Sequence, residues 1–280
     1  MDTAPVATTV RDLRIAVAAW RAGGRKIALV PTMGALHAGH RALVREAGKC
    51  ADNVVVSIFV NPAQFAPHED FDRYPRDLAS DLAKLGTAAH LVYAPAAAEM
   101  YPEGSATRIE VGGPSAGLES DFRPHFFAGV ATVVAKLLIQ CAPDFAMFGE
   151  KDYQQLQVVK RLVRDMGLPV EIVGVPTARE EDGLALSSRN AYLSADGRRI
   201  AGRLNAVLGD AVAKAQIGLR LATIEAEAKA ALVNAGFDRV DYVAIRDAET
   251  LQPIRHLSGP ARVLAAVHIG GTRLIDNMAV

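Results

Sequence analysis

The sequence predicts an α/β fold, a doubly wound parallel sheet, followed by a smaller C-terminal α+β domain. Short apolar runs alternate with helical patterns along the first part of the chain, which is typical of a parallel sheet. The run over 53–60 (NVVVSIFV) shows no polar alternation, as expected when helices cover both faces of a strand. After residue 176 helices come first and strands follow, which indicates an α+β arrangement. We therefore predict domains over 1–176 and 177–280.

Hydrophobic periodicity assigns each element in turn. In the second domain, two alanine-rich helices precede strands over 240–246 and 262–269. Thr223 is expected to cap the second of these helices, and Glu225 to lie in its first turn, where the helix dipole favours negative charge. In the first domain, strands are expected over 26–33, 53–60, 90–94, 145–148 and 170–175, and helices over 40–49, 77–85, 129–140 and 152–166.

Composition narrows the class of protein. The 280 residues carry 31 basic and 31 acidic side chains, so no net field favours wrapping nucleic acid or binding an anionic membrane. Cys50 and Cys141 lie far apart in apolar stretches and are expected to be small buried hydrophobic residues rather than disulfide or zinc partners. No signal-peptide pattern is seen, and no run approaches the roughly 20 apolar residues of a membrane span, so the cytoplasm is the expected location.

The segment PTMGALHAGH, residues 31–40, is the most informative one. It follows the first strand and opens the first helix, the place where ligands bind in parallel sheets. Gly34 allows a sharp turn, Gly39 allows a ligand to approach the backbone, and the helix start is expected to offer unpaired N–H groups to a phosphate. His37 and His40 could donate hydrogen bonds there, although a metal half-site or two solvated rings would give the same spacing. Neither a G-x-G-x-x-G fingerprint nor a P-loop sequence occurs.

Three other polar segments lie at expected turns. Lys151 could neutralise phosphates and Asp152 could hold a ribose or cap the next helix, with a plain polar loop as the alternative. The run LSSRN over 186–190 suits a mobile clamp on a polyphosphate but is also a common loop sequence. Asn61 and Gln64 follow the second strand, where neutral amides can bind hydroxyls and carboxylates; an Asn-Pro turn explains Asn61 alone.

Together these segments resemble the pantothenate synthetase (pantoate–β-alanine ligase) family along nearly the whole chain. The resemblance implies a Rossmann-like fold of the His-x-Gly-His nucleotidyltransferase type and a C-terminal lid domain. It also implies that ATP converts pantoate into a pantoyl adenylate, that the β-alanine amine then forms pantothenate, and that the enzyme is a homodimer using Mg²⁺. The motifs that carry it are PTMGALHAGH, VVVSIFVNPAQF, FGEKDYQQL, EIVGVP, DGLALSSRNAYL and TRLIDN.

The resemblance also implies residue roles. His37, His40 and Lys151 would be catalytic, with His40 the proton donor, and Mg²⁺ would be held mainly by the phosphates, with Asp81 and Glu150 as the nearby acidic candidates. The lid would close and carry 187–189 inward when ATP binds. Pantoate and β-alanine would contact Asn61, Gln64 and Gln155. ATP would contact Met33, Gly34, Ala35, Leu36, His37, Ala38, Gly39, His40, Gly149, Glu150, Lys151, Asp152, Ala178, Leu186, Ser187, Ser188 and Arg189.

One stretch departs from the family pattern, and rival functions remain to be compared. In RPHFFAGV, residues 123–130, His125 lies one place early and Phe126 occupies its position, so His125 is left out of the site. A nucleotidyltransferase acting on a phosphate monoester would need a basic pocket where this chain has Gln64 and Gln155. A non-catalytic nucleotide binder need not keep both histidines. A tRNA ligase is disfavoured by the neutral charge and the lack of an anticodon-sized domain.

Overall fold

The computed structural model describes residues 3–65 and 71–280 and divides the chain into two compact units. The N-terminal unit consists of Met1–Gly112, Arg123–Glu150 and Val158–Pro176, and the C-terminal unit of Gly113–Phe122, Lys151–Gln157 and Thr177–Val280. Two short segments that precede residue 177, Gly113–Phe122 and Lys151–Gln157, therefore group with the C-terminal unit. The prediction of two domains that meet at residue 176 stays a prediction. Within the described parts of the chain, no helix is long and apolar enough to cross a membrane.

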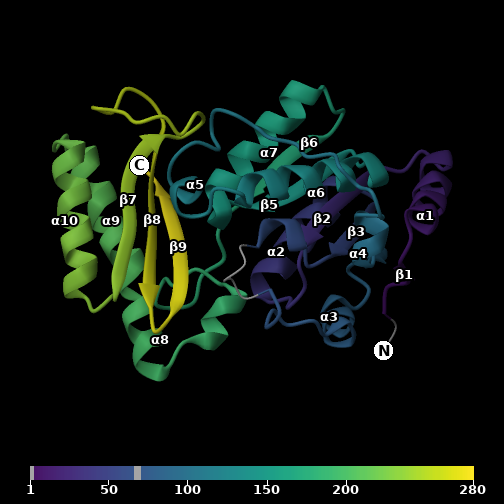
Figure 1. The fold of residues 1–280 in the computed structure, drawn as a ribbon, viewed down its shortest axis with the longest axis horizontal. Helices are drawn as coiled ribbons and strands as arrows, with labels where there is room; N and C mark the ends of the chain where they lie inside the picture. Colours follow the sequence, from purple (N-terminus) through teal and green to yellow (C-terminus); the bar gives the residue numbers. More distant parts are fainter. Residues whose placement is uncertain (1–2, 66–70) are drawn as a thin grey trace. The chain divides into compact units, whose positions relative to one another are not determined.

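The N-terminal unit is built on a six-stranded parallel sheet in the order β1-β4-β3-β2-β5-β6 (Figure 1). The strand order reverses direction at β2, because β3 and β4 lie on one side of that strand and β5 and β6 on the other. This confirms the predicted doubly wound α/β fold. The strands are β1 Val6–Ala7, β2 Ile27–Thr32, β3 Asn53–Ile58, β4 Leu91–Tyr93, β5 Phe145–Gly149 and β6 Glu171–Val175.

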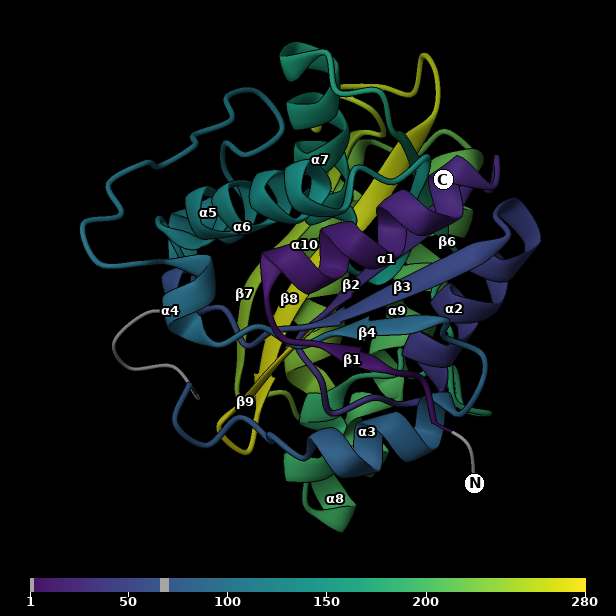
Figure 2. The same ribbon diagram turned by 90° about the vertical axis from the view of Figure 1, so that its right-hand side faces the viewer.

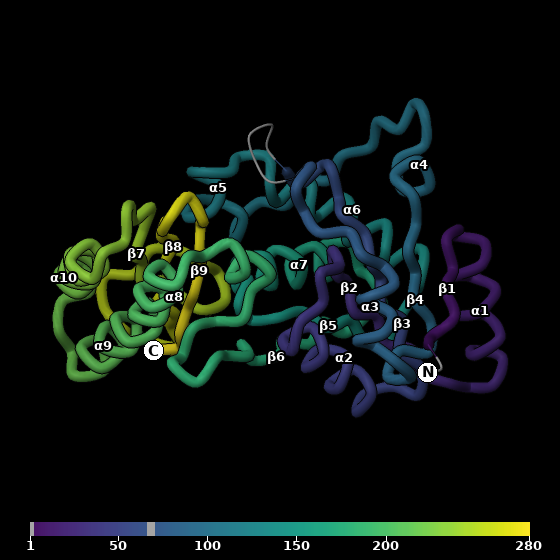
Figure 3. The backbone as a smooth tube through the Cα atoms, turned by 90° about the horizontal axis from the view of Figure 1, so that it is seen from below, coloured from purple at the N-terminus to yellow at the C-terminus, as the bar shows by residue number. Residues whose placement is uncertain are grey.

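Helices cover both faces of this sheet. The helices are α1 Val10–Ala22, α2 Ala38–Cys50, α3 Leu78–Leu85, α4 Ala97–Met100, α6 Phe126–Cys141 and α7 Tyr153–Met166, with short 3-10 turns η1 Pro62–Gln64 and η2 Glu150–Asp152. Figures 2 and 3 show α2 and α6 on opposite sides of the central strands. Leu43, Val44 and Ala47 of α2 pack with Val30 and Val56 of the strands in one buried cluster. Such two-sided cover explains why 53–60 shows no alternation of apolar and polar residues.

The C-terminal unit holds an antiparallel sheet in the order β7-β8-β9, which confirms the predicted smaller α+β part. Alternate residues of β8, among them Val263, Ala265 and Val267, pack against α9 and α10 in a single core. Figure 1 shows these two helices on one face of the sheet. The elements are α5 Glu119–Phe122, η3 Ser188–Tyr192, α8 Ala195–Ala201, α9 Arg203–Gln216, α10 Leu221–Asn234, β7 Arg239–Asp247, β8 Ala261–Ile269 and β9 Thr272–Ala279.

Several local expectations are corrected. Helix α10 begins at Leu221 after Arg220, with no side-chain cap, so the prediction that Thr223 caps it is wrong. Glu225 lies beyond the first turn, and its carboxylate accepts the backbone N–H of Ile245 on β7 at 2.7 Å. Tertiary contact, rather than the helix dipole, fixes that side chain. Six elements were not predicted from the sequence, because their patterns are too short or too polar to stand out: β1, α1, α4, α5, α8 and β9.

Candidate active site

The turn between β2 and α2 carries the two histidines and is held in a constrained backbone conformation. Gly34 has φ +83° and Ala35 φ +49°, both in the left-handed region that favours glycine. The Asp81 carboxylate, from α3, accepts the N–H of Ala35 at 2.9 Å and that of Leu36 at 2.8 Å. Its side chain is buried, with 2% of the residue exposed. A buried carboxylate therefore holds a turn whose conformation is otherwise disfavoured.

The backbone also fixes the two imidazole rings. His37 is the N-cap of α2, and its Nδ1 accepts the N–H of Gly39 at 3.1 Å. His40 Nδ1 in turn accepts the N–H of His37 at 3.3 Å, which closes a reciprocal capping box. A neutral ring that accepts at Nδ1 carries its proton on Nε2, so both rings are set as Nε2–H donors. The ring centroids lie 4.1 Å apart.

These contacts limit the expectation that the helix start offers unpaired N–H groups, since that of Gly39 is already paired. The N–H of Gly39 is capped by His37, and those of Ala35 and Leu36 are bound by Asp81. The donors of this site are therefore imidazole N–H groups more than backbone ones. Both oxygens of Asp81 already accept backbone bonds, which gives this residue a structural task beside the metal role considered from the sequence.

Asn61 and Gln64 form a polar corner after β3, and they are linked to each other. Asn61 is 1% exposed, and its Nδ2 donates to Gln64 Oε1 at 3.0 Å. Gln64 is partly exposed and its Nε2 lies 2.9 Å from Met33 Sδ, so the corner lies beside the end of β2. Helix α6 lies against η1, because a Cβ on Gly129 would lie 2.2 Å from the carbonyl oxygen of Ala63. Only glycine allows this approach of α6 to η1.

The predicted residues of the C-terminal unit are described by themselves. Lys151 Nζ lies 3.7 Å from Asp152 Oδ1, and the carbonyl oxygen of Lys151 accepts from Asn277 of β9 at 2.9 Å. Asp152 closes η2 directly before the first residue of α7, which is the N-cap position, and its capping of that helix stays a prediction. Gln155 is partly exposed. Its neighbour Gln154 is buried and donates to the carbonyl oxygens of residues 114 and 117, so it has a structural task.

The segment over 178–189 is a small hairpin. The N–H of Leu186 donates to the carbonyl oxygen of Ala178 at 2.9 Å, and Ser187 caps η3 by accepting the N–H of Arg189 at 3.3 Å. Arg179 forms a bidentate pair with the buried Asp276 of β9, at 2.7 and 2.9 Å. Arg179 therefore attaches the hairpin to the C-terminal sheet, and Ser188 and Arg189 follow the hairpin in η3.

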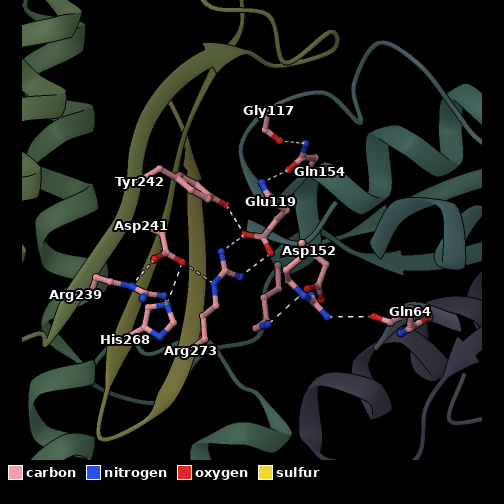
Figure 4. A network of polar contacts seen from close by, with 12 residues as sticks. Gln64, Gly117, Glu119, Asp152, Gln154, Arg239, Asp241, Tyr242, His268 and Arg273 are labelled. Atoms are coloured by element: carbon pink, nitrogen blue, oxygen red, sulfur yellow. Dashed lines mark hydrogen bonds and ion pairs between the residues drawn. The ribbon is translucent and has the colours of Figure 1, made fainter. Parts of the chain in front are cut away.

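A polar network of the C-terminal unit was not foreseen (Figure 4). The carboxylate of Glu119 accepts two hydrogen bonds from Arg273 at 2.6 and 2.8 Å and one from the Tyr242 hydroxyl at 2.7 Å. Asp241 of β7 accepts from Arg273 of β9 and from His268 of β8. Burial alone would raise the pKa of Asp241, but these hydrogen bonds hold it below its ordinary value. The network attaches the segment around Glu119 to the C-terminal sheet.

The structure also assigns places to residues that sequence reasoning had missed or set aside. Tyr101 donates its hydroxyl to Asn61 Oδ1 at 2.8 Å. His125 is exposed at the start of α6 without a capping bond, and Phe126 lies under the Arg123 guanidinium at 3.8 Å. Gly129 carried a usable signal, since a glycine inside a strongly apolar helix indicates a close backbone approach. Tyr101 carried none.

With this geometry described, the comparisons with known proteins become informative. A family model described as pantoate-beta-alanine ligase matches residues 5–279. The chain belongs to the pantoate–β-alanine ligase family. The family resemblance and the ligase class predicted from the motifs are thereby confirmed.

Close relatives support this membership. The pantothenate synthetase of Mesorhizobium japonicum is 56% identical over 281 residues, covering 100% of this chain and 99% of the relative. That of Caulobacter vibrioides is 55% identical over 286 residues and covers 100% of both chains. The crystal structure of pantothenate synthetase from Thermus thermophilus has a TM-score of 0.92 and 49% identity, covering 98% of each chain. The ligase of Francisella tularensis, complexed with β-γ ATP and β-alanine, has a TM-score of 0.81 and 33% identity over 98% of this chain and 97% of that one.

Proposed function

We propose that this ligase joins pantoate to β-alanine in two steps and releases AMP and pyrophosphate. A carboxylate resists attack by an amine because its charge makes the carbonyl a poor electrophile. In the first step a pantoate carboxylate oxygen attacks the α-phosphorus of ATP, and the bond to pyrophosphate breaks. In the second step the β-alanine nitrogen attacks the carbonyl of the adenylate, AMP leaves, and the amine loses a proton to solution. The observation that carries the proposal is the pair of Nε2–H donors at the start of α2.

His37 and His40 act on the transferring phosphate. Negative charge grows on the α-phosphate oxygens in the transition state, and preorganised N–H donors stabilise it there. Because each Nδ1 is occupied by a backbone N–H, each ring presents its donor without first changing tautomer. His40 is the principal donor of the pair, through the hydrogen bond of its Nε2–H. The turn from Met33 to Gly39 lies along the nucleotide, and its shape is set by Asp81.

The other nucleotide contacts come from the remaining predicted residues. Lys151 neutralises polyphosphate charge together with Ser187, Ser188 and Arg189, and Gly149 and Asp152 hold the ribose side. Leu186 and the backbone at Ala178 meet the adenine. Mg²⁺ would be held mainly by the nucleotide phosphates and water, with Asp81 and Glu150 as the acidic candidates, and would supply further charge neutralisation when bound. Among the residues that the structure describes, no three His, Cys, Asp or Glu side chains are grouped as a metal site.

Pantoate is held by neutral amides. Gln64 and Gln155 bind its oxygen atoms, and Asn61 contributes to this part of the site through Gln64. A site built to pair with hydroxyl groups discriminates strongly against analogues that lack them, since the buried polar partner is then left unpaired. Three further expectations belong to this proposal: a homodimer, a cytoplasmic location, and protection of 187–189 from solvent when ATP binds. Light scattering and hydrogen exchange with and without ATP test the first and the third.

One assay tests the function as a whole: exchange of labelled pyrophosphate into ATP. Exchange that requires pantoate but not β-alanine supports the adenylate route. Exchange driven instead by a phosphorylated alcohol would establish the rival nucleotidyltransferase, and no exchange with any acceptor would leave a nucleotide binder. His40→Ala should reduce pantoate-dependent exchange by roughly two to three orders of magnitude, as expected for loss of one charge-stabilising donor. A reduction of tenfold or less would remove His40 from this role.

A further inference from the structure

We propose that Asn61 and Tyr101 are positioning residues that fix the side-chain amide of Gln64 with its N–H groups toward the ligand. Gln64 then acts as a hydrogen-bond donor. The substrate group that it binds is a hydrogen-bond acceptor, namely an alcohol or carboxylate oxygen. The inference rests on the proposed contact of Gln64 with pantoate and adds its polarity.

The orientation of the Asn61 amide is set by backbone groups that have only one possible role each. Its Oδ1 accepts the N–H of Ala63 at 3.2 Å, and its Nδ2 donates to the carbonyl oxygen of Gly129 at 3.1 Å. A flipped amide would place Nδ2 against an N–H and Oδ1 against a carbonyl oxygen. Since Asn61 is 1% exposed, no water would repair those losses. One orientation of Asn61 is therefore enforced.

The Asn61 amide then dictates the orientation of Gln64. Nδ2 of Asn61 has a second hydrogen, which points at Gln64 and requires an acceptor there. Gln64 Oε1 provides it at 3.0 Å, so the NH2 group of Gln64 occupies the other end of the amide. That NH2 group lies 2.9 Å from Met33 Sδ, and a thioether sulfur is a weak acceptor. A substrate oxygen is a better partner and can replace the sulfur.

Tyr101 stabilises the same orientation of the Asn61 amide. Its hydroxyl donates to Asn61 Oδ1 at 2.8 Å, and burial raises the pKa of Tyr101 to about 12, so the phenol keeps its proton. Each bond in the series from Tyr101 through Asn61 to Gln64 runs in the same direction, and hydrogen bonds arranged in this way polarise one another. The close approach of Gly129 to η1 keeps the backbone groups in place.

Two substitutions at position 64 test the polarity. Gln64→Leu removes both donor and acceptor, whereas Gln64→Glu keeps acceptors and removes every N–H. If Gln64 donates to pantoate, the glutamate variant places two acceptors together. The apparent KM for pantoate in pyrophosphate exchange should then rise at least about tenfold for leucine and about tenfold more for glutamate. A glutamate variant that binds pantoate as well as, or better than, the leucine variant would overturn the inference.

Substitutions of Asn61 and Tyr101 test their positioning roles. Asn61→Asp replaces the Nδ2 donor by an acceptor, forces Gln64 to turn its amide, and should raise the pantoate KM about a hundredfold while the ATP KM changes less than about twofold. Tyr101→Phe should raise the pantoate KM about fivefold. The matched control is Tyr93→Phe, which removes another hydroxyl bonded to a side-chain amide, that of Gln140, in the same unit.

The outcomes separate this inference from the function on which it rests. Wild-type protein without pantoate-dependent exchange would refute the proposed function. Wild-type exchange together with equal effects of Tyr101→Phe and Tyr93→Phe would refute the positioning role of Tyr101. Equal changes in the KM of ATP and in that of pantoate in Asn61→Asp would show that Asn61 has only a general structural role. Thermal midpoints are measured for every variant, and if Asn61→Asp fails to fold, the pair of substitutions at Gln64 decides the proposal.

Discussion

Replacing Asp81 by Asn should weaken the turn that carries the two histidines. The carboxylate accepts two backbone N–H groups at 2.9 and 2.8 Å and is 2% exposed. An amide keeps one acceptor and turns an NH2 group toward the other backbone N–H, so one buried donor is orphaned. A hydrogen bond to a charged group contributes about 1.5–3 kcal/mol, and we expect a loss of stability of about 2–3 kcal/mol. The ion pair to Lys84, at 3.8 Å on a side chain that is 43% exposed, adds little.

The same substitution should reduce catalysis separately from stability. Gly34 and Ala35 hold positive φ angles with this support, and a displacement of the imidazole rings by about 1 Å costs on the order of a hundredfold in rate. Urea unfolding measures the stability, hydrogen exchange of the Ala35 and Leu36 amides measures the local effect, and pyrophosphate exchange measures the activity.

The control is Asp165→Asn, which breaks an exposed i,i+4 pair with Arg161 and should change stability by less than about 0.5 kcal/mol. An Asp81→Asn protein with unchanged amide protection at Ala35 and Leu36 would refute the reasoning.

Three further predictions concern other parts of the fold. Gly129→Ala places a Cβ 2.2 Å from a backbone carbonyl oxygen and should displace η1, raising the pantoate KM about tenfold or more in pyrophosphate exchange; an unchanged KM would mean that α6 and η1 separate without moving Gln64. Glu119→Gln removes the charge that the buried Glu119 carboxylate offers to the partly exposed Arg273, which keeps its pair with Asp241, and should lower the free energy of unfolding by about 2–3 kcal/mol in urea titrations; a loss below about 1 kcal/mol would contradict this. Burial raises the pKa of Cys141 to about 12, so a thiol reagent should label Cys50 alone in the native protein and both cysteines after unfolding; rapid native labelling of both would contradict the burial.

Much of the fold follows from local patterns in the chain. The predicted strands and helices of the N-terminal unit are all present, with ends displaced by a few residues, because helices on both faces require long apolar runs such as 53–60. The glycine turn before His37 was also readable, since glycine marks a backbone conformation that L-residues avoid. Cys50 is partly exposed rather than buried, because the end of a surface helix shields only one side of it.

Side-chain partners far apart in the sequence were not readable. Asp81 looked like a carboxylate available to a cation, and only its place on α3 shows it bound to the turn at Ala35 and Leu36. Glu225 looked like a helix-dipole residue and instead accepts a bond from β7. In both cases the chain pattern is the same for either role, and the choice depends on which backbone donor the fold brings near.

The sequence by itself determined the alternation of the main strands and helices, the family, and the residue types that follow the parallel strands, because periodicity and motif spacing are local properties of the chain. The tertiary structure alone decided the tautomers of His37 and His40, the orientation of the amides of Asn61 and Gln64, and the task of Asp81. Those properties depend on hydrogen-bond partners whose positions are set only when distant segments pack together, since a donor or acceptor has no direction until its partner is in place.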